Sequence, residues 1–337
     1  MPTRKHLQIC ICLLVCAVTV ASNAAGNPFI GEWQLTIPGG AAGWLGVEEK
    51  DGKLNASLLW GSGSVLPLAA AKVEGDRLLL TREYQIERKS AAGKKIKVNL
   101  VEHMTASVKG DEIHMVSVKP SDNGLDPDQE TKFSGRRQPP MPPAPDLSRV
   151  KFGKPINLFD GKSLTGWRLT APHAVNGWSV HDNLLVNNPK QEEGKPHKNY
   201  GNLRTKAEFE DFNLQVEVLV GTNQNSGIYL RGIYEVQVAD TFGHGIDPHN
   251  MGAVYSRITP TVAAEKPAGQ WQTLDITLVD RHVTVIFNGK QIIDNKPVMG
   301  CTGGALWSDV SKPGPIYLQG DHTGITYKSL VLKPVVK

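Results

Sequence analysis

The sequence has little cysteine, and most of it lies where it cannot crosslink a folded core. Cys10, Cys12 and Cys16 are close to the N-terminus, and Cys301 is the fourth and last. If the N-terminal segment is removed on export, no internal disulfide can form, and the fold depends on its hydrophobic core. Cys301 is a buried thiol or a nucleophile; no acid or histidine partner is evident from spacing, which favours the buried thiol.

The chain also lacks a basic run or stripe. It has 37 Lys and Arg against 33 Asp and Glu, a net charge of +4. Arg4 and Lys5 belong to the N-terminal segment, so the remainder has 35 basic against 33 acidic residues, a charge near +2. This balance offers no electrostatic basis for binding nucleic acid.

Long apolar runs are absent except near the N-terminus. There Arg4 and Lys5 precede an apolar stretch, 9–20, which is followed by small residues at 21–25. The order predicts a secretory signal over residues 1–25, and the apolar part is too short for a stable membrane span. Because no disulfide remains, we expect export to a bacterial periplasm or to the extracellular side.

The remaining 300 or so residues suffice for two domains. A proline-rich linker is predicted at 137–150, between an N-terminal part, 27–136, and a C-terminal part, 151–337. The N-terminal part has short β runs separated by glycine-rich or charged turns, which predicts a small antiparallel barrel or sandwich. No catalytic constellation is evident in it.

The C-terminal part is also predicted to be all β. Residues 212–220 alternate between apolar and polar, 271–279 and 282–287 form further β runs, and Asn288-Gly289 is a hairpin signal. Short strands without interleaved helices indicate an antiparallel sandwich of two sheets.

One segment, 226–240, has the strongest β period. Its apolar side chains are Ile228, Leu230, Tyr234, Val236 and Val238, and its other face carries Tyr229, Arg231, Glu235 and Gln237. We expect one extended segment that buries the first face and lines a polar, sugar-binding cleft with the second. An amphipathic strand with a solvated charged face is the alternative.

Five motifs stand in order along this part: 159–167, 203–212, 225–237, 267–273 and 314–319. In these motifs the chain resembles the 3-keto-disaccharide hydrolase domain family over nearly all of 151–337. The resemblance implies a concanavalin-like jelly roll with a sugar cleft on its concave sheet. It also implies cleavage of glycosides oxidised to a ketone at carbon 3, by hydrolysis or by elimination.

The resemblance is imperfect at one motif. The family often has Gln-Asp-His-Gly, whereas this chain has Gln319-Gly320-Asp321-His322-Thr323-Gly324. The inserted residues put the position of His322 in question. The N-terminal part lies outside the resemblance.

Cleavage next to a ketone needs a base near carbon 2, donors for the enolate oxygen and help for the leaving group. We assign Glu235 as the base or acid and Arg231 as its electrostatic partner, about 13 Å apart along one strand. His322 is the candidate proton shuttle to the leaving group; a structural loop histidine is the alternative.

Substrate-binding candidates share polar or aromatic side chains near these positions: Gln237, Gln319, Tyr229, Tyr255, Trp307, Asp240 and Asn225. The loop from Asp240 to His249 also contains His244 and Asp247, which makes a divalent cation possible although the spacing matches no standard site. No other cofactor is predicted, and the expected partner is a small molecule or an oligosaccharide.

Two other functions remain open. A carbohydrate-binding module without chemistry would use the same fold. A glycosidase acting on unoxidised glycans would need two carboxylates flanking the bond, and Glu235 is the one that can be named.

Overall fold

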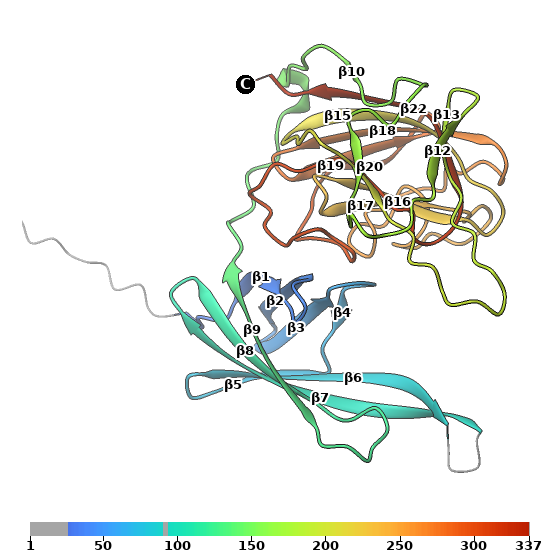
Figure 1. Cartoon of the computed structure of the whole chain (residues 1–337). Helices are drawn as coiled ribbons and strands as arrows, with labels where there is room; N and C mark the ends of the chain where they lie inside the picture. The colour runs from blue at the N-terminus through green and yellow to red at the C-terminus, as the bar shows by residue number, and fades with distance from the viewer. Residues whose placement is uncertain (1–25, 90–93, 337) are drawn as a thin grey trace, which may run out of the picture.

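The computed structural model describes residues 26–89 and 94–336 as two β structures joined by an extended segment (Figure 1). The predicted export signal lies outside the described residues. Across the described ranges the one helical element is a short 3₁₀ turn, Leu147–Arg149. In the same ranges, no helix has the length and apolarity to cross a membrane.

The N-terminal structure is one nine-stranded antiparallel sheet with the order β4-β3-β2-β1-β9-β8-β7-β6-β5. Its strands are β1 (Gly31–Thr36), β2 (Ala42–Lys50), β3 (Lys53–Trp60), β4 (Leu66–Pro67), β5 (Ala70–Glu74), β6 (Arg77–Lys89), β7 (Lys95–Lys109), β8 (Glu112–Lys119) and β9 (Gln129–Arg137). The segment between β4 and β5 bonds to both sides of the sheet, since Leu68 N–H donates to Ala56 O and Ala69 N–H to Thr81 O. The sheet therefore curls toward a barrel.

Apolar side chains, which alternate with polar ones along each strand, fill the inside of this curled sheet. Trp33 and Leu35 of β1 are fully buried, as are Leu45, Leu78 and Ile113 of neighbouring strands. Inward apolar residues that alternate with polar ones bury one face of the sheet and leave the other in water.

The C-terminal structure is a sandwich of two antiparallel sheets, a jelly-roll architecture. The larger sheet has the order β12-β13-β22-β15-β18-β19-β20, with β10 paired to β22, and the smaller has the order β11-β14-β21-β16-β17. The strands are β10 (Ile156–Asn157), β11 (Trp167–Leu169), β12 (Trp178–His181), β13 (Leu184–Asn187), β14 (Leu203–Thr205), β15 (Phe212–Leu219), β16 (Asn225–Leu230), β17 (Tyr234–Ala239), β18 (Trp271–Val279), β19 (His282–Phe287), β20 (Lys290–Pro297), β21 (Tyr317–Leu318) and β22 (Ile325–Pro334).

The two sheets enclose one apolar core. Ile228, Leu230, Val236 and Val238 of the smaller sheet belong to the same buried cluster as Leu214 and other residues of the larger sheet. Cys301 is a buried free thiol in this cluster, and burial raises its pKa to about 11. The preference for a buried thiol over a nucleophile agrees with this placement.

The prediction of a single extended segment over 226–240 is wrong. The chain reverses at Arg231 and Gly232, whose φ angles are 54° and 68°, so β16 and β17 form a hairpin. The predicted apolar side chains are nevertheless buried, because each strand of the hairpin directs its own apolar side chains into the core. The reversal moves Arg231 to the end of the hairpin and pairs Tyr229 directly with Glu235.

The two β structures pack against each other. Ala42, Trp44 and Leu59 of the N-terminal sheet join the buried cluster of the sandwich, and the Arg257 guanidinium lies 4.1 Å from the centre of the Trp44 ring. The connecting segment is fixed as well, since Asn295 donates to Pro145 O at 3.0 Å and Arg281 donates to Pro139 O at 3.1 Å.

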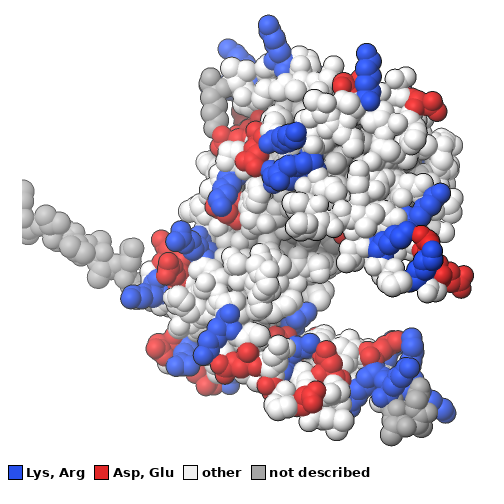
Figure 2. Space-filling model, in the orientation of Figure 1, with Lys and Arg blue, Asp and Glu red and all other residues white. Residues whose placement is uncertain are grey.

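Charges of both signs are interspersed over the face drawn in Figure 2, without a large patch of one sign. Many of them lie in the lower part of the view, where Figure 1 places the N-terminal sheet.

Candidate active site

A polar cavity of about 240 Å³ lies on the outer face of the smaller sheet, away from the core. Its floor comes from β16, β17 and β21, and its walls come from loops. The lining residues are Ser62, Gly63, Asn202, Asn225, Tyr229, Glu235, Gln237, Tyr255, Gly303, Gly304, Tyr317, Gln319, Asp321 and His322. The cavity thus collects most of the predicted site residues, from both strands of the hairpin and from the loops that carry Tyr255 and His322.

Glu235 is the most unusual group in this cavity. Its side chain is only 4% exposed, and burial raises the pKa of its carboxyl to about 8, a rise that the nearby Tyr229 hydroxyl and His322 only partly offset. Gly227 on the neighbouring strand makes the space for it, because a Cβ at Gly227 would lie 2.2 Å from Glu235 Oε1. A carboxyl that titrates near neutral pH can accept or donate a proton under working conditions.

His322 faces the same cavity from the loop after β21. Its Nδ1 is 2.8 Å from Asp321 Oδ1, and this contact raises the pKa of the imidazole. Burial alone would raise the pKa of Asp321, but the contact with His322 lowers it overall. The pair is therefore an aspartate that stabilises an imidazolium, with Nε2 left to act on another group.

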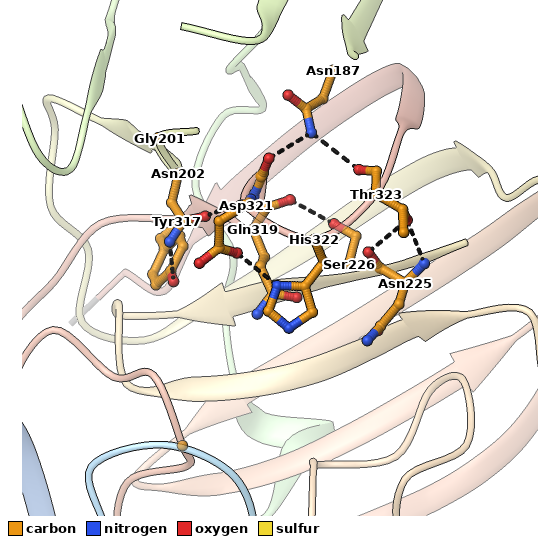
Figure 3. A network of polar contacts seen from close by, with 12 residues as sticks. Asn187, Gly201, Asn202, Asn225, Ser226, Tyr317, Gln319, Asp321, His322 and Thr323 are labelled. Carbon is orange, nitrogen blue, oxygen red and sulfur yellow. Dashed lines mark hydrogen bonds and ion pairs between the residues drawn. The ribbon is translucent and has the colours of Figure 1, made fainter. Parts of the chain in front are cut away.

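The loop that carries His322 is held at several points (Figure 3). Asn187 donates to Gly320 O at 3.0 Å and to Thr323 O at 3.1 Å. Asn202 Oδ1 accepts from Gly320 N–H at 2.7 Å, and Thr323 Oγ1 donates to Asn225 O at 2.9 Å. These bonds keep His322 in the cavity despite the two extra residues of the motif.

Gly320 is one of the two extra residues of the motif, and steric crowding explains why this residue is a glycine. A Cβ at Gly320 would lie 2.6 Å from Trp178 Nε1 and 2.8 Å from Gly201 O. Only glycine lets the loop pass this close to the strands beneath it.

Two tyrosines form a wall behind the carboxyl. The rings of Tyr229 and Tyr317 are stacked with centroids 4.1 Å apart, and the Tyr229 hydroxyl donates to Gly303 O at 2.7 Å. Asn202 Nδ2 donates to the Tyr317 hydroxyl at 2.9 Å. Tyr255 lines the cavity on another side and contacts His249 edge to face at 4.8 Å.

Amide groups provide sites for sugar hydroxyls. Gln237 Nε2 donates to Asn225 Oδ1 at 3.3 Å, while Gln237 Oε1 is buried without a partner in the protein. Gln319 and Asn225 line the cavity beside it. An unpaired buried acceptor costs free energy unless water or a ligand supplies a donor, so Gln237 is suited to bind a hydroxyl.

Three predicted residues lie elsewhere. Arg231 is 2% exposed, and its guanidinium donates to Val310 O at 2.7 Å and to Lys312 O at 3.0 Å. Trp307 packs against the apolar cluster of the sandwich. Asp240 accepts from Asn223 N–H at 3.0 Å. None of the three is among the residues that line the cavity, and for Arg231 the cause is the reversal of the chain after β16.

The loop predicted as a weak metal site has a different arrangement. His249 Nδ1 is 2.6 Å from Asp247 Oδ1, and its Nε2 is 2.8 Å from Ser64 Oγ of the N-terminal sheet. Asp240 and His244 do not join them in a ligand cluster: within 26–89 and 94–336, no group of three or more His, Cys, Asp or Glu side chains is arranged to hold a metal ion.

Several lining residues were not predicted. Asp321 could have been found, since an acid next to the candidate histidine is a visible signal. Asn202, Tyr317 and the glycines of the 303–304 turn have no pattern that marks them. Ser62 and Gly63 come from the N-terminal sheet, where no sequence feature indicated a site.

A known protein family matches the part of the chain that forms the sandwich. The sequence model of the family described as "3-keto-alpha-glucoside-1,2-lyase-like domain" matches residues 154–333. The chain belongs to this family. The match includes every strand of the smaller sheet and the His322 loop, and it leaves out the N-terminal sheet.

Among individual proteins, the chain is 26% identical over 166 residues to a 3-keto-disaccharide hydrolase of Bacteroides thetaiotaomicron; the match covers 41% of this chain and 57% of that protein. A crystal structure of a provisionally assigned glycosyl hydrolase from Parabacteroides distasonis is 30% identical, covering 57% of this chain and 93% of that one, with a TM-score of 0.44. A second such structure from that organism is 19% identical, covering 54% and 94%, with a TM-score of 0.45. The chain therefore spans a little more than half the length of the curated relative that it matches.

Proposed function

We propose that this protein is an exported enzyme that cleaves glycosides already oxidised to a ketone at carbon 3, by elimination. The base removes the proton on carbon 2, the bond from carbon 1 to the glycosidic oxygen breaks, and a double bond forms between carbons 1 and 2. The aglycone leaves as an alcohol once its oxygen has been protonated. Addition of water to the unsaturated product would make the net reaction a hydrolysis.

The buried Glu235 carboxyl is the observation that carries the proposal. A ketone makes the neighbouring C–H acidic, but its removal still needs a base stronger than an ordinary carboxylate. Burial raises the pKa of Glu235 to about 8, which makes its ionised form a better base and leaves an appreciable fraction ionised near neutral pH. The position of Glu235 at the floor of a polar cavity lets it reach a ring bound above the sheet.

His322 is assigned to the leaving group. The contact with Asp321 keeps the imidazole protonated to higher pH, so that it can donate its proton to the departing oxygen. Gln237, Gln319 and Asn225 bind ring hydroxyls and the oxygen of the enolate. Tyr255 offers an aromatic face for the CH groups of the sugar.

A glycosidase for unoxidised glycans is less well supported. Besides Glu235, the carboxylate that lines the cavity is Asp321, and it is engaged by His322. An ordinary glycosidase needs its second carboxylate to act as nucleophile or as base for water. A carbohydrate-binding module without chemistry does not need a carboxyl as strongly desolvated as that of Glu235.

The test uses a 3-keto-glucoside with a chromogenic aglycone and its unoxidised parent. The wild-type protein is expected to release the aglycone from the first and not from the second. When the reaction runs in D₂O, recovered substrate and the hydrated product should gain deuterium at carbon 2, whereas the unsaturated product has no hydrogen there. Equal release from both substrates, or binding without release, would overturn the proposal.

A further inference from the structure

The N-terminal sheet contributes a wall to the candidate active site. The loop from Gly61 to Val65, between β3 and β4, brings Ser62 and Gly63 into the lining of the cavity that holds Glu235. The family match begins at residue 154, so this wall is supplied from outside the matched region.

The loop is fixed against the sandwich along its whole length. Gly304 N–H donates to Gly61 O at 2.8 Å, and Val65 N–H donates to Ser256 Oγ at 2.9 Å. Between these ends, Ser64 Oγ is 2.8 Å from His249 Nε2. Three bonds over five residues hold the backbone in one place relative to the floor of the cavity.

The contact is also closely packed. A Cβ at Gly303 would lie 2.2 Å from Gly63 O and 2.6 Å from Gly63 N, so the two glycine-rich loops touch backbone to backbone. Next to them, Trp44 covers Gly300, where a Cβ would lie 2.4 Å from the ring. Packing of this kind does not allow the loop to move without displacing the sheet behind it.

We propose that the Gly61–Val65 loop is a substrate-selecting wall that restricts this enzyme to short glycosides, one oxidised ring with a small aglycone or a single further sugar. The proposal rests on the proposed function for the identity of the oxidised ring. Without the loop, the floor of the smaller sheet would be bounded by the 303–304 turn and the His322 loop and would be open on the side of the N-terminal sheet. With the loop, the cavity is about 240 Å³, below the usual range of about 300–1,000 Å³ for ligand pockets.

Ser62 is the residue that meets the substrate. It is exposed to the cavity, and its hydroxyl can donate to or accept from a sugar hydroxyl. Gly63 has a φ of +72°, and no atom lies within 4 Å of its Cβ position. Because it has no side chain, it leaves space beside Ser62 for the sugar ring.

The experiment compares Ser62→Trp and Ser62→Ala with the wild type on 3-keto-glycosides that carry a methyl group, one glucose or three glucoses as aglycone. Ser107→Trp is the matched control, on an exposed position of β7 in the same sheet. The wild type should prefer the two short substrates at least tenfold over the long one in kcat/KM. Ser62→Trp should lose at least tenfold on the glucose aglycone, and Ser62→Ala should raise KM about threefold with little change in kcat.

A second measurement separates the wall from the chemistry. Backbone NMR reports binding without turnover when the wild type is titrated with methyl glucoside, maltose and maltotetraose, and Glu235→Gln with their 3-keto counterparts. Ser62 and Gly63 amides should shift together with those of Tyr255 and Gly304.

The outcomes separate the two proposals. Cleavage of unoxidised substrates alone would remove the proposed function, while the length preference on those substrates would still support the wall. Cleavage of 3-keto substrates with Ser62→Trp equal to Ser107→Trp at every length would overturn the wall alone. Sugar binding that shifts Tyr255 and Gly304 but not Ser62 and Gly63 would also overturn it, and no binding of any probe would overturn both.

Discussion

Tyr229 and Glu235 are directly paired across the β16–β17 hairpin, with Tyr229 stacked on Tyr317. This pairing sets the carboxyl against an aromatic wall instead of leaving it in water. Desolvation by that wall and by the rest of the cavity is the main reason that the pKa of Glu235 is raised. The geometry of one hairpin thus raises the basicity of the Glu235 carboxylate.

Glu235→Gln is expected to lower kcat on a 3-keto-glucoside by about 10²–10⁴-fold, because the amide cannot accept the proton from carbon 2. Steady-state release of a chromogenic aglycone measures this. Glu217→Gln is the control, since Glu217 lies on the other sheet and bonds to Lys328. Near-full turnover by Glu235→Gln would remove Glu235 from the chemistry.

The same substitution is expected to change stability with pH. The pKa of Glu235 is about 8 in the folded protein against an ordinary value of 4.5, so the folded state holds a proton that the unfolded state releases between these values. The stabilisation is present below about pH 4.5 and is lost as pH rises to about 8. Glu235→Gln should therefore be more stable than the wild type at pH 9, by on the order of a few kcal/mol, and similar to it at pH 4.5. Chemical denaturation at both pH values gives the difference; equal wild-type and variant stabilities at pH 9 would contradict it.

His322→Asn is expected to distinguish substrates by their leaving groups. Loss of the acid should lower kcat by about 10²-fold for an alkyl or sugar aglycone, which needs protonation, and by much less for nitrophenol, which leaves as an anion. A series of aglycones of graded acidity measures the slope. An equal loss across the series would instead assign His322 to carbon 2 or to binding.

Asp321→Asn is expected to move one limb of the pH profile. Asp321 is the main reason that the pKa of His322 is raised, so its removal should shift the His322 limb of kcat/KM to lower pH. The Glu235 limb near pH 8 should move less, because Asp321 contributes less to the pKa of Glu235 than burial, Tyr229 and His322 do. The maximum should fall because less imidazolium is present at the optimum. A profile that keeps both limbs would show that Asp321 does not act through His322.

Gly227→Ala is expected to lower kcat by at least tenfold while the protein stays folded, because the new Cβ would overlap Glu235 Oε1 and push the carboxyl aside. Gly245→Ala is the control, since nothing lies within 4 Å of a Cβ there. Circular dichroism checks the fold, and wild-type activity of Gly227→Ala would contradict the expected displacement.

Arg231→Met is expected to affect stability more than catalysis. The guanidinium satisfies the carbonyls of Val310 and Lys312, and loss of such charged hydrogen bonds costs about 1.5–3 kcal/mol each. Denaturation should show the loss, while KM of the folded variant should stay close to that of the wild type. Unchanged stability with a large fall in kcat would restore Arg231 to the chemistry.

The local pattern of the chain was enough for the all-β class, for the apolar face of 226–240, and for Glu235 and Gln237 as site candidates. His322 was predicted from the resemblance of its motif to that of the family. Two-residue alternation shows which side chains face the core. The same side chains face the core whether the segment is one strand or two. The position of Arg231 could not be obtained this way, because the reversal depends on two residues with positive φ that a β period does not mark.

The sequence by itself determined which side chains are available for chemistry; the tertiary structure decided which of them meet. The raised pKa of Glu235 comes from desolvation by Tyr229 and its surroundings, and the orientation of His322 comes from a loop held by Asn187 and Asn202. Ser62 reaches the cavity because the N-terminal sheet packs on the sandwich through Trp44. These are contacts between residues far apart in the chain, and no local pattern encodes them.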